Sequence, residues 1–216
     1  MSGKYLKSFF MIPVFILGLI LSFLGQLPLG TMSMTATQIA VQENFRNAWK
    51  YSFGVAVVEL VYLRFVLSGM QWIIEHQNLL DIFNWVTVFL FLVLGVVSFI
   101  TAQKQEAGKK TLLLNNRFDR FLLGMSMSAM NPAQIPFWLV WTGYFLNAGW
   151  LSPGFYSFNI FTLGSALGTV SGLVVYMYGG NWLVTKMKTS NRTLNKIMGI
   201  VFLIAALAQV YRIKYP

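Results

Sequence analysis

The sequence contains no cysteine, and it carries few charged side chains for its length. Of its 216 residues, 10% are charged, six are acidic and one is histidine. The lack of cysteine excludes disulfide bonds, thiol chemistry and metal sites built from thiolates. Hydrophobic residues make up 56% of the chain and the mean hydropathy is positive, a balance far from that of a soluble globular domain. We therefore expect an integral membrane protein.

The charge that remains is strongly basic, with a formal net charge of +10. A basic balance can indicate nucleic-acid binding, but here lysine and arginine lie in short clusters between apolar segments, where they determine membrane topology. We therefore expect no nucleic-acid partner. The segments 8–42, 82–103 and 121–185 contain no charged residue, and each can hold at least one membrane-spanning helix of about 20 residues.

The hydrophobic segments predict an all-α membrane protein with six transmembrane helices in a single domain, residues 1–216. Lys4 and Lys7 precede the first apolar segment as in a signal peptide, but this segment is too long and lacks a clear cleavage site, so we expect it to be retained. Gly164, Gly168 and Gly172 recur at every fourth position and predict close helix packing. The six predicted helices are 8–42 with a break, 51–74, 82–102, 120–147 with a break, 155–180 and 194–212.

The distribution of lysine and arginine predicts the orientation in the membrane. The first, third and fifth connections hold eleven of these residues, and the other side holds four. Because basic connections remain in the cytoplasm, this pattern places those three connections inside and both termini outside. The alternative is that the first segment is a re-entrant hairpin and not a crossing, which would place the N-terminus inside.

The first and fourth segments resemble each other and predict an inverted repeat. Each is unusually long, and each is interrupted by proline, at Pro28 and at Pro132, with an offset of 104 residues. Three helices in each half, 8–102 and 119–213, would make the two copies cross the membrane in opposite directions. Interrupted helices at corresponding positions of such repeats indicate the substrate site of a transporter.

The two breaks bring polar groups without fixed charge into the membrane. Proline clashes with the carbonyl four residues earlier, so we expect Pro28 to free the carbonyl of Leu24 and Pro132 to free that of Ser128. Free carbonyls are stable in a membrane only against protein or water, so we expect the breaks to line a hydrated pocket near the midplane. A purely structural kink is the alternative. The predicted substrate-binding residues at the breaks are Gln26, Pro28, Gly30, Thr31, Asn131, Pro132, Gln134 and Trp138.

The second predicted helix contains two charged residues within its span, Glu59 and Arg64. Each costs about 3 kcal/mol or more in the membrane unless it is paired or hydrated. Five residues separate them by roughly 140° around a helix, which disfavours a simple pair. We therefore expect Glu59 to accept and release a proton, and Arg64 to bind an anionic group of the substrate. A buried ion pair with a structural role is the alternative.

Four segments together resemble the lysine exporter (LysE/RhtB) family of amino-acid translocators. These are the first segment with its internal proline, FRNAWKYSFGVAVVELVY, FLLGMSMSAMNPAQIPFW and LNKIMGIVFLIAALAQ. Asn131-Pro132 matches the Asn-Pro of the family's fourth helix, and the acidic residue of its second helix falls on Glu59. The family's Pro-Gly-Pro on the first helix is here Pro28-Leu29-Gly30. The resemblance implies an exporter of amino acids or related metabolites in the bacterial inner membrane.

Other classes of function fit the sequence less well. The superfamily's thiol-electron carriers are excluded by the lack of cysteine, and its metal exporters are disfavoured because only Glu59 offers a buried hard ligand. An intramembrane protease would need catalytic groups within the spans, but His76 lies in a connection and Asp81 and Asp119 lie at helix ends. A non-transporting scaffold or assembly subunit remains as an alternative. We expect no cofactor, and the expected partners are an amino-acid-like small molecule, membrane lipid and a second copy of the chain in a homodimer.

Overall fold

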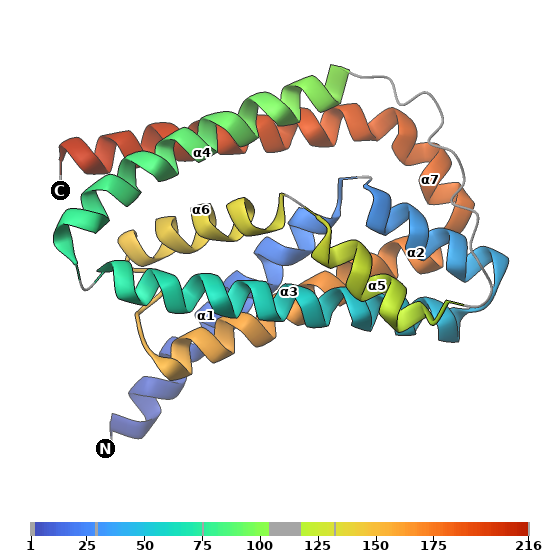
Figure 1. Cartoon of the computed structure of the whole chain (residues 1–216), viewed down its shortest axis with the longest axis horizontal. Coiled ribbons are helices and arrows are strands. Elements are labelled where there is room, and N and C mark those ends of the chain that lie inside the picture. Colours follow the sequence, from blue (N-terminus) through green and yellow to red (C-terminus); the bar gives the residue numbers. More distant parts are fainter. Residues whose placement is uncertain (1–2, 29, 75, 104–117, 132, 216) are drawn as a thin grey trace.

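The computed structural model describes residues 3–28, 30–74, 76–103, 118–131 and 133–215, and every regular element in these ranges is a helix (Figure 1). The predicted all-α architecture is thus confirmed for the described residues. Pro132 and most of the third predicted connection lie outside them. The helices are α1 (Gly3–Gln26), α2 (Thr31–Gln42), α3 (Phe45–Ile74), α4 (Gln77–Gln103), α5 (Arg120–Ala129), α6 (Gln134–Asn147) and α7 (Phe155–Lys214).

Three helical segments among the described residues are long and apolar enough to span a membrane. They are Phe45–Ile73 of α3, Ile82–Gln103 of α4 and Phe155–Gly179 of α7. A fourth span is possible if Met11–Gln26 and Thr31–Gln42, which are bent by 80° relative to each other, cross as one broken helix. The chain is therefore a multi-pass membrane protein, while the number of six spans and the inverted repeat stay predictions.

Successive segments run back and forth along the long axis of the molecule (Figure 1). α1 and α2 together run in one direction, α3 returns, and α4 runs out again. α5 and α6 together return, and the two halves of α7 then run out and back. The N-terminal end of α1 and the C-terminal end of α7 consequently lie at the same end of the bundle.

The C-terminal region differs from the sequence prediction, because the predicted connection between 180 and 194 is itself helical. Neither proline nor glycine occurs between Gly180 and Gly199, so no residue there stops the helix. α7 instead changes direction near its middle, and its C-terminal half packs beside α4 (Figure 1). Within that half, Lys196–Tyr211 is apolar but shorter than a typical span.

Both predicted helix breaks are present, between α1 and α2 and between α5 and α6. The prediction that they leave two carbonyl groups free is wrong. The amide of Leu27 donates to the carbonyl of Leu24 at 3.2 Å, and the amide of Asn131 donates to that of Ser128 at 3.1 Å. Each helix tightens into a turn with bonds between residues three apart, and this turn satisfies the carbonyl that proline would otherwise expose.

Glycines bring the backbones of α1 and α7 into direct contact, as their spacing predicted. A Cβ atom on Gly164 would collide with the carbonyl of Phe15, and one on Gly168 would collide with the carbonyl of Leu19. Gly18 faces α7 in the same way. Because no side chain separates the two helices here, short polar groups on each can reach the other.

Candidate functional site

A buried polar cluster joins α1, α3 and α7 around Glu59, whose exposed fraction is 5%. The hydroxyl of Ser22 lies 3.0 Å from Oε1 of Glu59, and Nε2 of Gln26 donates to Oε2 at 3.4 Å. Ser22 also shares a hydrogen bond of 2.6 Å with the hydroxyl of Thr169. We call these four residues the Glu59 cluster. Among the described residues, the structure gives Glu59 hydrogen bonds but no basic partner.

The local sequence explains why these groups meet. Ser22 and Gln26 are four residues apart and therefore lie on one face of α1. Thr169 follows Gly168, whose lack of a side chain lets α7 approach α1 so closely that a Cβ there would lie 2.9 Å from that of Ser22. The glycine contact thus sets the distance across which the hydroxyls of Ser22 and Thr169 interact.

The other predicted residues of the first break lie beside the cluster but are not shown to contact it. Pro28 is half-buried in the bend, and Gly30 precedes α2 with an extended backbone. Thr31 is exposed, and its carbonyl accepts a hydrogen bond from Thr35 at 2.8 Å. The break is also held by Tyr176 of α7, whose hydroxyl donates to the carbonyl of Leu27.

The second break has its own polar contacts with α3. Gln134 is buried, and its Oε1 lies 3.2 Å from the hydroxyl of Ser128, which also lies 3.2 Å from the carbonyl of Val55. Asn131 acts locally, because its Oδ1 accepts the amide of Ala133 at 3.2 Å. Val55 is one helical turn from Glu59, so α3 faces the polar groups of both breaks.

Trp138 is enclosed in the apolar core, with an exposed fraction of 0%. Its ring packs edge-on against Phe137 and Phe161, with centroid distances of 5.2 and 6.1 Å. The same core includes Leu21 and Leu63, which neighbour the Glu59 cluster along α1 and α3. Trp138 therefore forms part of an apolar layer next to the cluster.

The structure separates Arg64 from Glu59. The guanidinium carbon of Arg64 lies 5.5 Å from the ring centre of Phe155 and 5.8 Å from that of Phe158. Its Nη1 is buried, and within the described residues no hydrogen-bond partner for this nitrogen is present. The alternative of a structural ion pair between the two residues is not observed.

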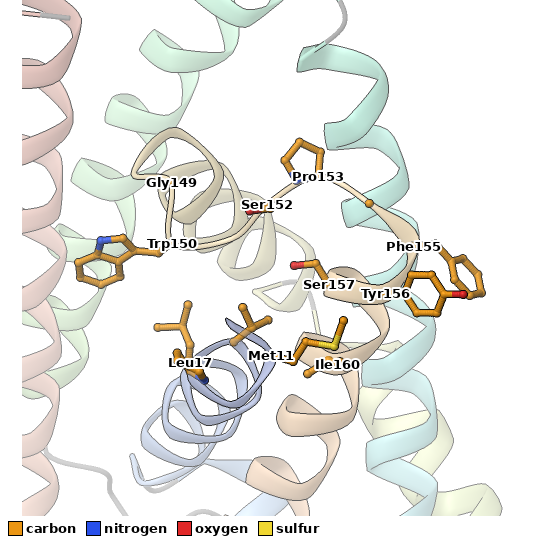
Figure 2. A pocket seen from close by; sticks show the side chains of 13 residues that line it. Met11, Leu17, Gly149, Trp150, Ser152, Pro153, Phe155, Tyr156, Ser157 and Ile160 are labelled. Atoms are coloured by element: carbon orange, nitrogen blue, oxygen red, sulfur yellow. The ribbon is translucent and has the colours of Figure 1, made fainter. Parts of the chain in front are cut away.

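A cavity of about 730 Å³ lies at the end of the bundle where α6 connects to α7 (Figure 2). Its walls come from the first half of α1, the connection before α7 and the first turns of α7, and they are mostly apolar. Ser157 lines it with a buried hydroxyl that has no hydrogen-bond partner among the described residues. The predicted binding residues do not line this cavity, which lies beyond the Trp138 layer from Glu59.

A charged contact lies at the opposite end of the bundle. Glu43 follows α2, and its Oε1 and Oε2 lie 2.5 Å from Nη2 and 3.0 Å from Nε of Arg120, the first residue of α5. Burial raises the pKa of Glu43, but the hydrogen bonds from Arg120 and Asn47 and the charge of Arg120 outweigh this, so that the pKa lies below its ordinary value of 4.5.

Several functional candidates were missed from the sequence. Ser22 and Thr169 are two among several hydroxyl residues of α1 and α7, and only the glycine pattern of α7 gave a signal near them. Tyr62, whose hydroxyl donates to the carbonyl of Ala129 at 3.0 Å beside the second break, gave no signal at all. In the ranges that the structure describes, no group of three histidine, aspartate or glutamate side chains could hold a metal ion.

Comparison with known proteins agrees with the membrane architecture and the helix breaks. The family model of the LysE type translocators matches residues 23–212, a range that contains both breaks and Glu59. No curated protein and no solved structure shows a significant match. The proteins of this family are transporters that move small molecules across a membrane. Because the match covers most of the sequence, this chain belongs to the LysE type translocator family and is a membrane transporter.

Proposed function

We propose that the protein is a secondary exporter of amino acids or related small metabolites, and that Glu59 couples export to proton movement. The observation that carries this proposal is the burial of a single carboxyl group in a span, among hydroxyl and amide groups and beside a broken helix. A charge held this way without a basic partner costs about 3 kcal/mol or more. Binding of a proton or of a cationic group relieves that cost.

The hydrogen bonds of the Glu59 cluster can accommodate both protonation states. Each hydroxyl has one hydrogen to donate. When Glu59 is charged, Ser22 donates to it and Thr169 donates to Ser22. When Glu59 is neutral, it can donate to Ser22, which donates to Thr169, which in turn donates to the carbonyl of Ser165 at 3.1 Å. Reversal of this chain of bonds requires no rearrangement of the helices.

The same carboxylate is suited to bind the ammonium group of an amino acid. A proton and an ammonium group cannot occupy it together, and this exclusion is the simplest physical basis for exchange of one against the other. Gln26 and the second-break residue Gln134 supply further uncharged donors and acceptors near α3. Arg64 is a separate candidate contact for an anionic group, beside Phe155 at the wall of the cavity.

The orientation follows from the basic residues. Arg46, Lys50 and Arg120 lie near the end where α2 ends and where α3 and α5 begin, and we call this the basic end. By the positive-inside rule it faces the cytoplasm, which places both termini and the cavity outside a bacterial inner membrane. Export then proceeds from the basic end, past Glu59, toward the cavity.

The test is efflux from liposomes that contain the purified protein and are loaded with a mixture of amino acids. We expect an imposed pH gradient to accelerate efflux of at least one amino acid in the wild type. Glu59→Gln keeps the size of the side chain and one acceptor oxygen for Ser22 but cannot exchange a proton, so its efflux should no longer respond to the gradient. Glu59→Asp should keep a response.

Asp119→Asn is the matched control, because it also converts a carboxyl to an amide but lies on the exposed N-cap of α5, where asparagine caps equally well. Its response to the gradient should equal that of the wild type. If Glu59→Gln keeps the wild-type rate and pH profile, Glu59 has no part in coupling. If folded wild-type protein releases none of the amino acids, the scaffold alternative is favoured.

A further inference from the structure

The pair of Glu43 and Arg120 connects the two broken helices directly. Glu43 is the C-cap of α2, the second half of the first broken helix, and Arg120 begins α5, the first half of the second. The side chains are 14% and 5% exposed, so the pair is largely withdrawn from water. Arginine meets the carboxylate through two nitrogen atoms, and this geometry fixes orientation as well as distance.

Other contacts reinforce closure at the same end. Nδ2 of Asn47 donates to Oε2 of Glu43 at 2.8 Å, which ties α3 to the pair. The ring of Phe45, at the start of α3, stacks on Tyr178 of α7 with a centroid distance of 4.7 Å. These contacts join α2, α3, α5 and α7 at the basic end.

An apolar layer lies between this pair and the Glu59 cluster. It includes Ala36 of α2, Tyr51 and Val55 of α3, and Leu173 of α7, each with an exposed fraction of 0%. The hydroxyl of Tyr51 reaches the carbonyl of Met32 at 3.3 Å, beside the first break. A polar substrate that enters from the basic end must pass both the pair and this layer to reach Glu59.

The opposite end of the bundle is different, because it holds the cavity of about 730 Å³ (Figure 2). Among the described residues, polar and aromatic contacts therefore join the helices at the basic end, and a cavity lies at the other end. Such asymmetry is expected of a transporter in which one end opens while the other is closed.

We propose that Glu43 and Arg120 form the gate of the basic end, which holds α2 against α5 and opens to admit substrate to the Glu59 cluster. This inference rests on the proposed transport through that cluster. An ion pair suits a gate at the edge of a bundle, because both charges regain water when the helices separate, and this recovers part of the cost of breaking the contact.

The gate can be tested without a transport assay. The measurement is the labelling rate of a cysteine placed in the apolar layer, between the ion pair and the Glu59 cluster. The chain has no cysteine of its own, so Ala36→Cys provides a single thiol in the apolar layer. A buried thiol of this kind reacts slowly with a membrane-impermeant methanethiosulfonate reagent. Adding Arg120→Ala leaves Glu43 unpaired and should raise the labelling rate from the basic end by on the order of 100-fold.

Arg46→Ala is the matched control, because Arg46 is exposed at the same end and the change removes the same charge. It should leave the labelling of Ala36→Cys unchanged. The exchanged pair, Glu43→Arg with Arg120→Glu, should return labelling toward the slow rate, and a variant that had merely lost its fold would not be rescued in this way. Equal labelling with and without Arg120 would overturn the gate.

A second experiment fixes the gate shut. Glu43→Cys and Arg120→Cys are combined and joined by a short bifunctional methanethiosulfonate reagent, since two long side chains hold their backbones too far apart for a direct disulfide. Export should fall to background when the link forms and recover when dithiothreitol cleaves it, while either single cysteine should be unaffected by the reagent. Undiminished export by the linked protein would show that the pair has only a structural role. In that case the gate is refuted, while the proposed transport function is not.

Discussion

A single methyl group added at Gly168 should disrupt the contact between α1 and α7 and lower the stability of the protein. A Cβ there would collide with the carbonyl of Leu19 and lie 2.9 Å from the amide nitrogen of Phe23. Ordinary Cβ contacts begin at 3.4 Å, so the α1 backbone must move by at least about 0.5 Å, the difference between these two distances. Backbone atoms cannot rotate away as a flexible side chain can. We expect Gly168→Ala to destabilise the protein by about 1–3 kcal/mol through overpacking.

Gly69 provides a matched control on α3, because no atom lies within 4 Å of a Cβ built there. Gly69→Ala gains helix propensity without a clash and should stabilise the protein by about 0.5–1 kcal/mol. The two variants should thus differ by about 2 kcal/mol or more. For a chain of this size, that difference corresponds to roughly 4–8 °C in the melting temperature, measured by thermal unfolding of the purified protein in detergent.

The same substitution should also weaken coupling, because separation of α1 from α7 lengthens the 2.6 Å hydrogen bond between Ser22 and Thr169. Export by Gly168→Ala should therefore respond less to a pH gradient than export by Gly69→Ala. The reasoning would be refuted if Gly168→Ala melted at the same temperature as Gly69→Ala or above it.

Three further predictions concern other parts of the molecule. The pKa of Glu43 in the folded protein lies below 4.5, so its pairing with Arg120 stabilises the fold above about pH 4.5. This contribution is lost as the pH falls through the lower pKa of the folded protein. Melting temperatures measured against pH should show the loss in the wild type but not in Glu43→Gln. Trp138→Ala should cost about 3–5 kcal/mol in unfolding free energy, since the side chain is completely buried, and a cost below about 1 kcal/mol would mean that the apolar layer is loosely packed. Ser22→Ala should reduce the pH response of export in the wild type but have no further effect in Glu59→Gln, and additive effects of the two changes would show that Ser22 acts independently of the carboxyl group.

The helix breaks and the burial of Glu59 could be predicted from the sequence because their causes are local. Proline in an apolar segment removes a backbone hydrogen bond and clashes with the preceding turn, which favours a break there, although Pro13 is accommodated within α1. A carboxyl group in the middle of such a segment is buried when the segment spans the membrane. The close packing of α1 against α7 was also visible, since glycines spaced four apart lie on one helix face.

The partners of Glu59 could not be predicted, because they depend on contacts between distant parts of the chain. Ser22 and Thr169 are 147 residues apart, and their contact depends on how the glycines of one helix fit against the backbone of another. Arg64 was expected to bind an anionic group, but the sequence gave no sign that it packs against Phe155 and Phe158. The carbonyls at the breaks were expected to be free, because the position of a proline does not show whether the helix end before it tightens into a turn. The backbone conformation that satisfies these carbonyls is visible only in the structure.

Among the residues that the structure describes, Glu59 is the only acidic one that lies within the candidate spans. An exporter coupled through this carboxyl group alone carries one proton in each cycle, and this sets an upper limit on the work it can perform. One elementary charge moving through 100 mV supplies about 2.3 kcal/mol. A tenfold concentration ratio requires about 1.4 kcal/mol, so each 100 mV of proton-motive force can sustain at most a roughly 50-fold gradient of an uncharged or zwitterionic solute.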